Sequence, residues 1–290
     1  MDEAINWLNH YDGRARVLGG GTDILLDIQQ GRSPAVEAMV DTSRIEGLDR
    51  ISIDNGHVVI GCAVTHTQIV RNDAIKRFGT CLVESCGVIG GPQVRNVATL
   101  AGNVAHAMPA GDGSIGLLAL GGEIEVADAG GSRWIPLQDG FEGPGKSAID
   151  HHRALLTRLR FKAISEREGS AFTRVMRPQG VALPMIAMAA RVQLDENDTI
   201  TGVRISLGPA GPVPCLAEPA MDVLRGGKAN TRQYEAAAEA ILASVLLRTS
   251  KYRATREYRE AMIRTHLPII LNRAAKRARS VHPTPGGAGK

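Results

Sequence analysis

The chain contains 290 residues, of which 43% are hydrophobic and 22% are charged, a balance typical of a globular protein long enough for two domains and a sizeable core. Aromatic residues make up only 3% and the formal net charge is +4, which argues against a nucleic-acid-binding surface built from basic and stacking side chains. No apolar run approaches the roughly 18 residues of a membrane span. The N-terminal residues show no secretory signal pattern, so we expect a cytoplasmic protein.

The N-terminal part of the chain alternates between helical and extended patterns. Apolar residues at helical spacing predict a helix over 2–11, and a glycine turn joins a strand at 15–18 to a helix at 22–30. A strand at 38–41 and a hairpin at 51–60 are expected to complete a small α/β unit. Further helices are predicted at 65–71, 81–88 and 114–120, and further strands at 123–127 and 154–161.

A charged stretch at 163–169 marks the predicted domain boundary. Beyond it the pattern predicts strands at 170–176, 184–194 and 199–207, and helices at about 216–224, 231–247 and 253–278. The basic run Arg273–Arg279 is interpreted as the solvated end of the last helix. We therefore expect an α+β fold with one domain over 1–165, divided into subdomains at about 1–62 and 63–165, a second domain over 166–279, and a disordered tail at 280–290.

Two glycine-rich segments have the composition of anion-binding loops. The first reads Leu18-Gly-Gly-Gly-Thr-Asp23, and the second reads Thr99-Leu-Ala-Gly-Asn103 and continues to Pro109-Ala-Gly-Asp112. Glycine lets backbone amides approach a ligand closely, and amides at a helix N-terminus favour a negative charge. Together the loops predict a split cradle for a diphosphate. The alternative for each loop alone is a strand-to-helix turn that uses glycine only for its backbone freedom.

Three other patterns do not indicate a nucleotide-binding, metal-binding or catalytic site. The segment Gly140–Ser147 has the spacing of a phosphate-binding P-loop, but Arg133 and Pro136 precede it where a buried central strand should be apolar. We interpret it as a structural turn. The four cysteines have no CxxC spacing and the histidines have no metal-ligand spacing, so free thiols and no metal site are expected. We assign no catalytic residue.

The two loops resemble those of the FAD-binding (medium) subunit of the xanthine dehydrogenase and carbon monoxide dehydrogenase family of molybdenum hydroxylases. Three further segments strengthen the resemblance, namely Gly91-Pro-Gln-Val-Arg-Asn96, Phe141-Glu-Gly-Pro-Gly-Lys-Ser147 and Glu257-Tyr-Arg259. The resemblance covers nearly the whole chain. It implies a two-subdomain FAD-binding domain of the PCMH/vanillyl-alcohol oxidase type, followed by a sheet-plus-helices domain like the C-terminal domain of carbon monoxide dehydrogenase flavoproteins.

The resemblance also implies which residues contact FAD. The loops would hold the diphosphate, Asp112 would hold ribityl or ribose hydroxyls, and the apolar side chains would flank the isoalloxazine ring. The implied set is Gly19, Gly20, Gly21, Thr22, Asp23, Ile89, Val94, Thr99, Leu100, Ala101, Gly102, Asn103, Asp112 and Leu156. Whether His106 or Phe172 touches the flavin stays open, and Phe172 stands where many relatives have a tyrosine.

The partners implied by the resemblance are a large molybdenum-cofactor subunit and a small subunit with two [2Fe-2S] clusters, assembled as a dimer of heterotrimers. Electrons would pass from the clusters to FAD and then to an external acceptor. No nucleic acid and no membrane span are expected. The segment Leu183-Pro184 looks like the carbon monoxide dehydrogenase branch, so NAD as the acceptor stays open. The alternative function is a non-catalytic assembly module that has kept the fold and lost the flavin.

Overall fold

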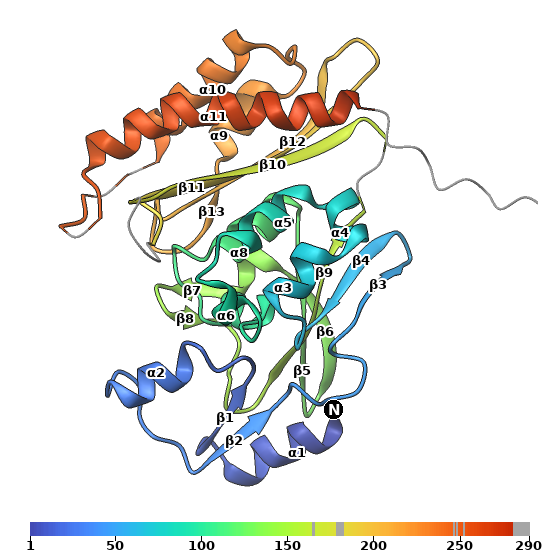
Figure 1. Cartoon of the computed structure of the whole chain (residues 1–290), viewed down its shortest axis with the longest axis vertical. Coiled ribbons are helices and arrows are strands. Elements are labelled where there is room, and N and C mark those ends of the chain that lie inside the picture. Colours follow the sequence, from blue (N-terminus) through green and yellow to red (C-terminus); the bar gives the residue numbers. More distant parts are fainter. Residues whose placement is uncertain (164–165, 178–182, 246, 248, 252, 281–290) are drawn as a thin grey trace, which may run out of the picture.

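The computed structural model describes residues 1–163, 166–177, 183–245, 247, 249–251 and 253–280. Three layers follow one another along the long axis of the molecule: a small N-terminal unit, a central sheet with its helices, and a C-terminal sheet covered by long helices (Figure 1). Residues 281–290 of the predicted tail (280–290) and residues 164–165 of the predicted boundary (163–169) lie outside the described residues.

The N-terminal unit contains the predicted helices and strands. It consists of α1 (Asp2–Tyr11), β1 (Ala15–Leu18), α2 (Ile24–Gln29) and β2 (Ala38–Asp41), with β1 and β2 paired in parallel. Helix α1 buries Ala4, Ile5 and Leu8 because these positions share one face at helical spacing. Helix α2 starts two residues later than predicted, since Thr22 and Asp23 belong to the turn.

The hairpin at 51–60 does not complete the N-terminal unit, and that expectation is wrong. Strands β3 (Ile51–Asp54) and β4 (His57–Gly61) belong to a five-stranded sheet in the order β3-β4-β9-β5-β6. Strand β4 pairs with β9 (Leu155–Lys162) along its whole length, because Val58 and Ile60 are fully buried in the central core. The sheet is completed by β5 (Glu123–Asp128) and by β6 (Gly131–Pro136). Strand β6 is an edge strand, where proline is tolerated.

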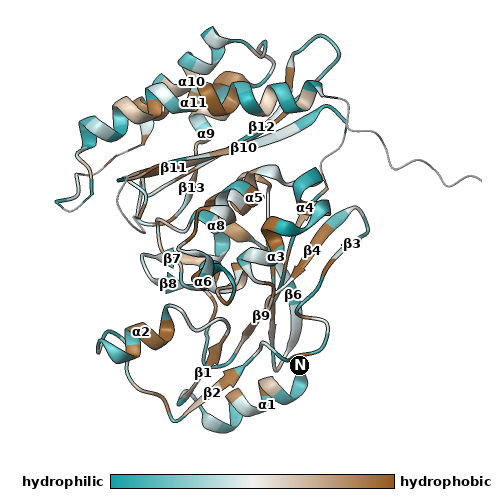
Figure 2. Ribbon diagram, in the orientation of Figure 1, coloured by the Kyte–Doolittle hydropathy of each residue, from teal (hydrophilic) through white to brown (hydrophobic). Residues whose placement is uncertain are grey.

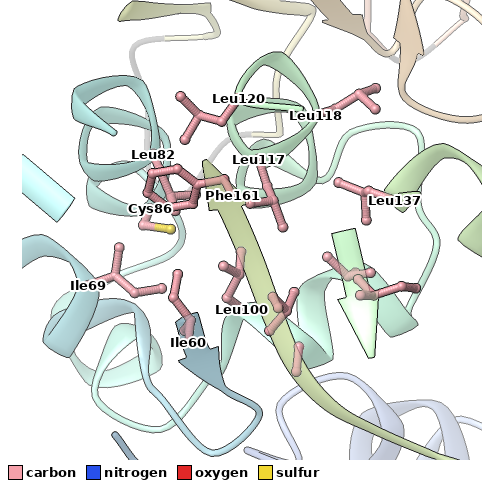
Figure 3. Packing of buried hydrophobic residues seen from close by; sticks show 14 of the residues in the cluster. Ile60, Ile69, Leu82, Cys86, Leu100, Leu117, Leu118, Leu120, Leu137 and Phe161 are labelled. Carbon is pink, nitrogen blue, oxygen red and sulfur yellow. The ribbon is translucent and has the colours of Figure 1, made fainter. Parts of the chain in front are cut away.

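Six helices pack on the central sheet and enclose the core. They are α3 (His66–Arg71), α4 (Asp73–Phe78), α5 (Thr80–Gly87), α6 (Pro92–Arg95), α7 (Leu100–Ala105) and α8 (Asp112–Ala119). Leu100, Leu117 and Phe161 meet in the middle of this core (Figure 3). Helices α4, α6 and α7 have no counterpart among the predicted elements, because six or fewer residues are too few to show an apolar period.

The segment with P-loop spacing forms a small hairpin. A short 3-10 turn, η1 (Leu137–Gly140), leads into β7 (Phe141–Gly143), which pairs antiparallel with β8 (Lys146–Ser147). Gly145 at the turn has a φ of +69°, and Lys146 is exposed. A P-loop lysine would instead open a helix. The interpretation of this segment as a structural turn is therefore confirmed.

The C-terminal sheet is buried on both faces. Strands β10 (Glu168–Val175), β11 (Ile186–Leu194), β12 (Ile200–Gly208) and β13 (Cys215–Leu216) pair antiparallel in that order. Helices α9 (Glu218–Leu224), α10 (Thr231–Ser244) and α11 (Arg256–Arg279) lie on one face (Figure 1), while α5 and α8 lie against the other. Strand β11 is accordingly hydrophobic along most of its length (Figure 2).

The basic run at the end of α11 is solvated only in part: Arg273 and Lys276 are exposed, as expected, whereas Arg277 and Arg279 are half-buried. The guanidinium of Arg277 donates to the carbonyl of Ser170 and lies 2.6 Å from the Glu84 carboxylate, and Arg279 lies 3.2 Å from Asp198. The helix reaches these partners because Ala274, Ala275 and Ala278 are buried against the sheet.

The close approach of α11 to β10 depends on Gly169. A Cβ at this position would lie 2.2 Å from the Ala274 carbonyl oxygen and 2.6 Å from the Ala278 nitrogen, so Gly169→Ala should lower the free energy of unfolding by about 1–3 kcal/mol through overpacking. Gly202→Ala is the matched control, because its Cβ meets only the flexible Gln193 side chain. Urea unfolding of both variants checks this, and equal stabilities would show that the helix can move away at little cost.

Candidate functional site

A cavity of about 580 Å³ lies where the two glycine-rich loops meet the C-terminal domain. Its wall is formed by the loop after β1, the segments around α6 and α7, the start of α8, and strand β9. The C-terminal domain contributes Arg174, Leu183 and Arg253. The volume is in the range of small-molecule and cofactor sites.

The first loop touches the second backbone to backbone. A Cβ at Gly20 would lie 2.1 Å from the Val97 carbonyl oxygen and 2.8 Å from the Ala98 Cα, so only glycine allows this contact. Gly21 has a φ of +74°, which also favours glycine. The turn then leads into α2 and leaves the amide groups of its first turn next to the cavity.

The second loop is fixed by side chains that cap two helices. The Thr99 Oγ1 accepts a hydrogen bond from the Gly102 amide at 3.0 Å and caps α7. The Asn103 Oδ1 accepts from the Ser114 amide at 3.0 Å, which connects α7 to the first turn of α8. A Cβ at Gly102 would meet only the Thr99 hydroxyl, at 3.1 Å. The face of Gly102 that borders the cavity is therefore open.

Charged and polar side chains border the same cavity near the loops. The His106 Nε2 lies 3.9 Å from the Asp23 Oδ1, so this pair connects the two loops. The guanidinium of Arg16 donates through Nη1 to the Ser33 hydroxyl at 2.8 Å, while its buried Nε has no hydrogen-bond partner in the part of the chain that the structure describes. A buried donor without a partner favours an anionic or hydroxyl-bearing ligand.

A buried ion pair joins the start of α8 to strand β10. The Asp112 Oδ2 accepts from the Arg174 Nη1 at 2.7 Å, and the two side chains are 5% and 7% exposed. Burial raises the pKa of Asp112 to about 6, against the opposing charge of Arg174. The second carboxylate oxygen, Oδ1, has no hydrogen-bond partner among the described residues.

A neutral histidine forms another part of the wall. His66, the first residue of α3, is 1% exposed, and its Nδ1 finds no partner in the described part of the chain. Burial, with a smaller contribution from the charge of Arg95, lowers the pKa of His66 to about 4. Its imidazole therefore contributes a neutral polar atom to the cavity.

Apolar side chains form another part of the cavity wall, called here the apolar slot. Ile89, Val94 and Leu156 line it together with Cys62. Burial raises the pKa of the Cys62 thiol to about 11, so this cysteine stays protonated and behaves as a small hydrophobic side chain. The guanidinium of Arg95 donates to the carbonyls of Ile89 and Gly90 at 3.0 and 2.8 Å, which holds this part of the wall in place.

The structure brings together all of the predicted cofactor residues except one. Those that line the cavity are Gly19, Gly20, Gly21, Thr22, Asp23, Ile89, Val94, Thr99, Ala101, Gly102, Asn103, Asp112 and Leu156. The exception is Leu100, whose side chain is fully buried in the central core because helix α7 turns it away from Gly102. His106 lines the cavity, whereas Phe172 is buried in the core.

Several polar residues of the wall were not identified from the sequence. They are Arg16, His66, His151 and Arg174. Their neighbours in the chain form no recognisable motif, and only the tertiary fold buries them next to the loops. The one weak signal is the Thr65–Gln68 capping box, which places His66 at the start of a helix.

The described residues contain neither a candidate metal site nor a membrane-spanning helix. Within them, no group of three histidine, cysteine, aspartate or glutamate side chains could hold a metal ion, and all four cysteines are free. No helix in the same part of the chain is long and apolar enough to cross a membrane.

The cavity fits FAD in its polar and apolar parts. Backbone amides and the Arg16 guanidinium favour a diphosphate, the unpartnered Asp112 Oδ1 suits a sugar hydroxyl, and the apolar slot suits a flat ring. These three features line one cavity.

The pKa of His66 predicts how stability depends on pH. The unfolded chain binds a proton on this histidine below about pH 6.5, whereas the folded chain binds it only near pH 4. Stability should therefore fall as the pH falls through this window, by up to about 3 kcal/mol more in the wild type than in His66→Gln. Urea unfolding between pH 7 and 4 checks this. Parallel profiles would show that His66 takes up its proton in the folded chain.

Comparison with known proteins identifies the two parts of the chain. Residues 1–161 match the family of the FAD binding domain in molybdopterin dehydrogenase. Residues 170–274 match the family of the CO dehydrogenase flavoprotein C-terminal domain. The first match alone covers more than half of the chain.

Relatives and solved structures agree with these matches. The chain is 28% identical over 279 residues to the xanthine dehydrogenase FAD-binding subunit of Escherichia coli O157:H7, covering 96% of this chain and 94% of that protein. It is 29% identical over 281 residues to the carbon monoxide dehydrogenase medium chain of Afipia carboxidovorans, covering 96% and 93%.

The fold is similar to two solved carbon monoxide dehydrogenases. The enzyme of Hydrogenophaga pseudoflava gives a TM-score of 0.88 at 24% identity over 95% of this chain and 94% of that one. A Cu,Mo-CO dehydrogenase in its cyanide-inactivated form gives 0.86 at 26% identity over 94% of each chain. The chain therefore belongs to the family of flavoprotein oxidoreductase subunits that carry the FAD-binding domain of molybdopterin dehydrogenases.

Proposed function

We propose that the chain binds one non-covalent FAD and passes electrons from the [2Fe-2S] clusters of a partner subunit to an external acceptor. The observation that carries this proposal is the single cavity that joins the two glycine-rich loops to an apolar slot. The family of the chain supports the choice of FAD over other dinucleotides. When bound, the flavin supplies the redox chemistry, because it exchanges electrons singly or in pairs.

The residues of this chain bind and orient the cofactor. The amides of Gly21 to Asp23 would hold the diphosphate with Gly102 and Asn103 lying against it, and Asp112 would accept a hydrogen bond from a ribityl or ribose hydroxyl. The apolar slot would exclude water from the ring and leave few polar groups near it. Proton transfer by a dedicated acid or base of this chain is not required for this role.

The electron donor is proposed to come from another chain. The described residues hold no group of side chains that could bind a metal, so the clusters would belong to a partner. Elements next to the cavity expose large apolar side chains, with Leu25 and Val97 each 50% exposed, Leu26 43% and Val94 37%. Exposed apolar groups around a site mark an interface. Binding of the partner to these exposed side chains would bring the electron donor close to the apolar part of the cavity.

The full assembly is proposed to contain a large molybdenum-cofactor subunit and a small iron–sulfur subunit, as a dimer of heterotrimers. The relatives support it, because carbon monoxide dehydrogenase has a medium chain among its subunits. A cytoplasmic location stays a prediction, which cell fractionation tests.

Gly102→Val is expected to weaken FAD binding at least tenfold, because its branched side chain would enter the cavity from the open face of α7. The fold should persist, since only the Thr99 hydroxyl lies near the new Cβ. Titration of the flavin-free chain with FAD, followed by fluorescence, measures the affinity. Lys146→Ala is the matched control, because its exposed side chain lies outside the cavity. Equal affinities of both variants and the wild type would show that the second loop does not contact FAD.

Gly20→Val is unsuitable for this test. It would force apart the contact between the two loops, so a loss of flavin could follow from misfolding.

Affinity purification of the tagged chain from its own cell is expected to recover two further subunits, with molybdenum and iron in the preparation. The reason is that a flavin subunit without its own metal centre needs a donor held close to the ring. Metal analysis and mass spectrometry provide the measurement. A chain recovered alone, free of molybdenum and iron yet fully active as an oxidoreductase, would contradict the proposal.

A further inference from the structure

Helix α8 is held at its C-terminal end by side chains of the C-terminal sheet. Arg204 donates to the Leu118 carbonyl at 3.4 Å, and Arg191 donates to the Leu120 carbonyl at 3.1 Å. These donors come from β12 and β11. Carbonyl groups at a helix C-terminus have no partner within the helix. The C-terminal domain therefore adds hydrogen bonds at the end of a helix that belongs to the other domain, beside the backbone bond that Gly121 donates to the Leu118 carbonyl.

The same domain also controls the N-terminal end of α8. Asp112, the first residue of the helix, pairs with Arg174 of β10 at 2.7 Å, and both side chains are almost completely buried. Breaking a buried pair by removing one partner leaves an uncompensated charge in a medium that solvates it poorly. Without Arg174, the ionised form of Asp112 would lose its main stabilising contact.

Asp112 uses only one of its two oxygens in this pair. Its Oδ1 has no partner among the described residues, although the residue is 4% exposed and lines the cavity. A buried acceptor without a donor is costly, and a ligand hydroxyl would satisfy it. An ionised carboxylate accepts such a bond more strongly than a neutral carboxyl group does.

We propose that Arg174 is a positioning residue for the flavin site: it keeps Asp112 ionised, so that Asp112 Oδ1 accepts a hydrogen bond from a hydroxyl of the bound cofactor. The affinity for FAD then depends on the docking of the C-terminal domain through this one ion pair. This inference rests on the proposed function.

Few other charges act on Asp112. On α5, the thiol of Cys86 faces it, and burial raises the pKa of that thiol so far that it stays neutral. The other titratable side chains that line the cavity among the described residues are Arg16, Asp23, Cys62, His66, His106, His151 and Arg253. Of these, His106 is replaced in a control variant, because its Nε2 lies 3.9 Å from the Asp23 Oδ1 on the first loop.

The test is a titration of the full-length, flavin-free chain with FAD at pH values from 5 to 8.5, followed by flavin fluorescence. In the wild type the affinity should fall as the pH falls through about 6, where Asp112 takes up its proton. In Arg174→Gln the midpoint of this fall should move up by at least about one pH unit, since burial then acts unopposed. Half or more of Asp112 would then be protonated at pH 7, so binding there should be at least about twofold weaker than in the wild type, and it should recover at pH 8.5.

Four further variants distinguish a positioning role of Arg174 from a purely structural one. Arg174→Lys should keep the wild-type profile, because it retains the charge. Asp112→Asn should bind more weakly and show no midpoint near pH 6, and adding Arg174→Gln to it should change the affinity less than about twofold. His106→Gln should leave the midpoint in place. If Arg174→Gln does not fold, the other variants still test the proposal. A midpoint retained in Asp112→Asn, or a profile of Arg174→Lys that differs from the wild type, would contradict it.

Two kinds of failure are distinguishable. A wild-type chain that folds but binds no FAD at any pH would refute the proposed function itself. A wild-type chain that binds FAD, with Arg174→Gln weaker by the same factor at every pH, or with the midpoint retained in Asp112→Asn, would refute only the role assigned to Arg174.

Discussion

The contact between the two glycine-rich loops is the constraint on which the site depends. Gly20 touches the backbone at Val97 and Ala98 so closely that no side chain fits between them. This contact brings the N-terminal unit against the central domain and places the amides of two helix starts around one space. Neither loop alone would surround a diphosphate. The glycine at this position therefore acts through the neighbouring loop in addition to lining the cavity.

The second requirement is the docking of the C-terminal sheet onto α8. Side chains of the sheet donate hydrogen bonds to carbonyls at the C-terminal end of this helix, and one of them forms an ion pair with its first residue. Because α8 carries Asp112 and is tied through Ser114 to Asn103, the C-terminal domain reaches the cofactor loop through a rigid buried helix. On the proposed role of Arg174, a domain that contributes little of the cavity wall would still influence the site.

Much of the fold follows from local sequence patterns. The long helices α10 and α11 and the strands β10 to β12 were predicted close to their observed bounds, because each is long enough to show its apolar period. The short helices α4, α6 and α7 were not predicted. The membership of β3 and β4 in the central sheet was also missed, because it is decided by pairing with β9, far along the chain.

The residues of the candidate site were likewise predictable from the sequence only in part. Residues within the two loops were recognised because their motifs are contiguous in the sequence. Leu100 was included with its neighbours, but one helical step turns its side chain into the core. Arg16, His66 and Arg174 are ordinary residues in the sequence. Their importance arises from burial without a full set of partners, or from an ion pair between domains, and both properties exist only in the folded chain.

The central claim is that one cavity holds FAD across both loops. A crystal structure of the full chain with its cofactor tests this most directly. The account predicts the diphosphate between Gly21–Asp23 and Gly102–Asn103, the ring against Leu156 and Ile89, and a flavin hydroxyl within hydrogen-bond distance of Asp112 Oδ1. A flavin bound elsewhere, or a diphosphate that contacts only one of the two loops, would contradict it.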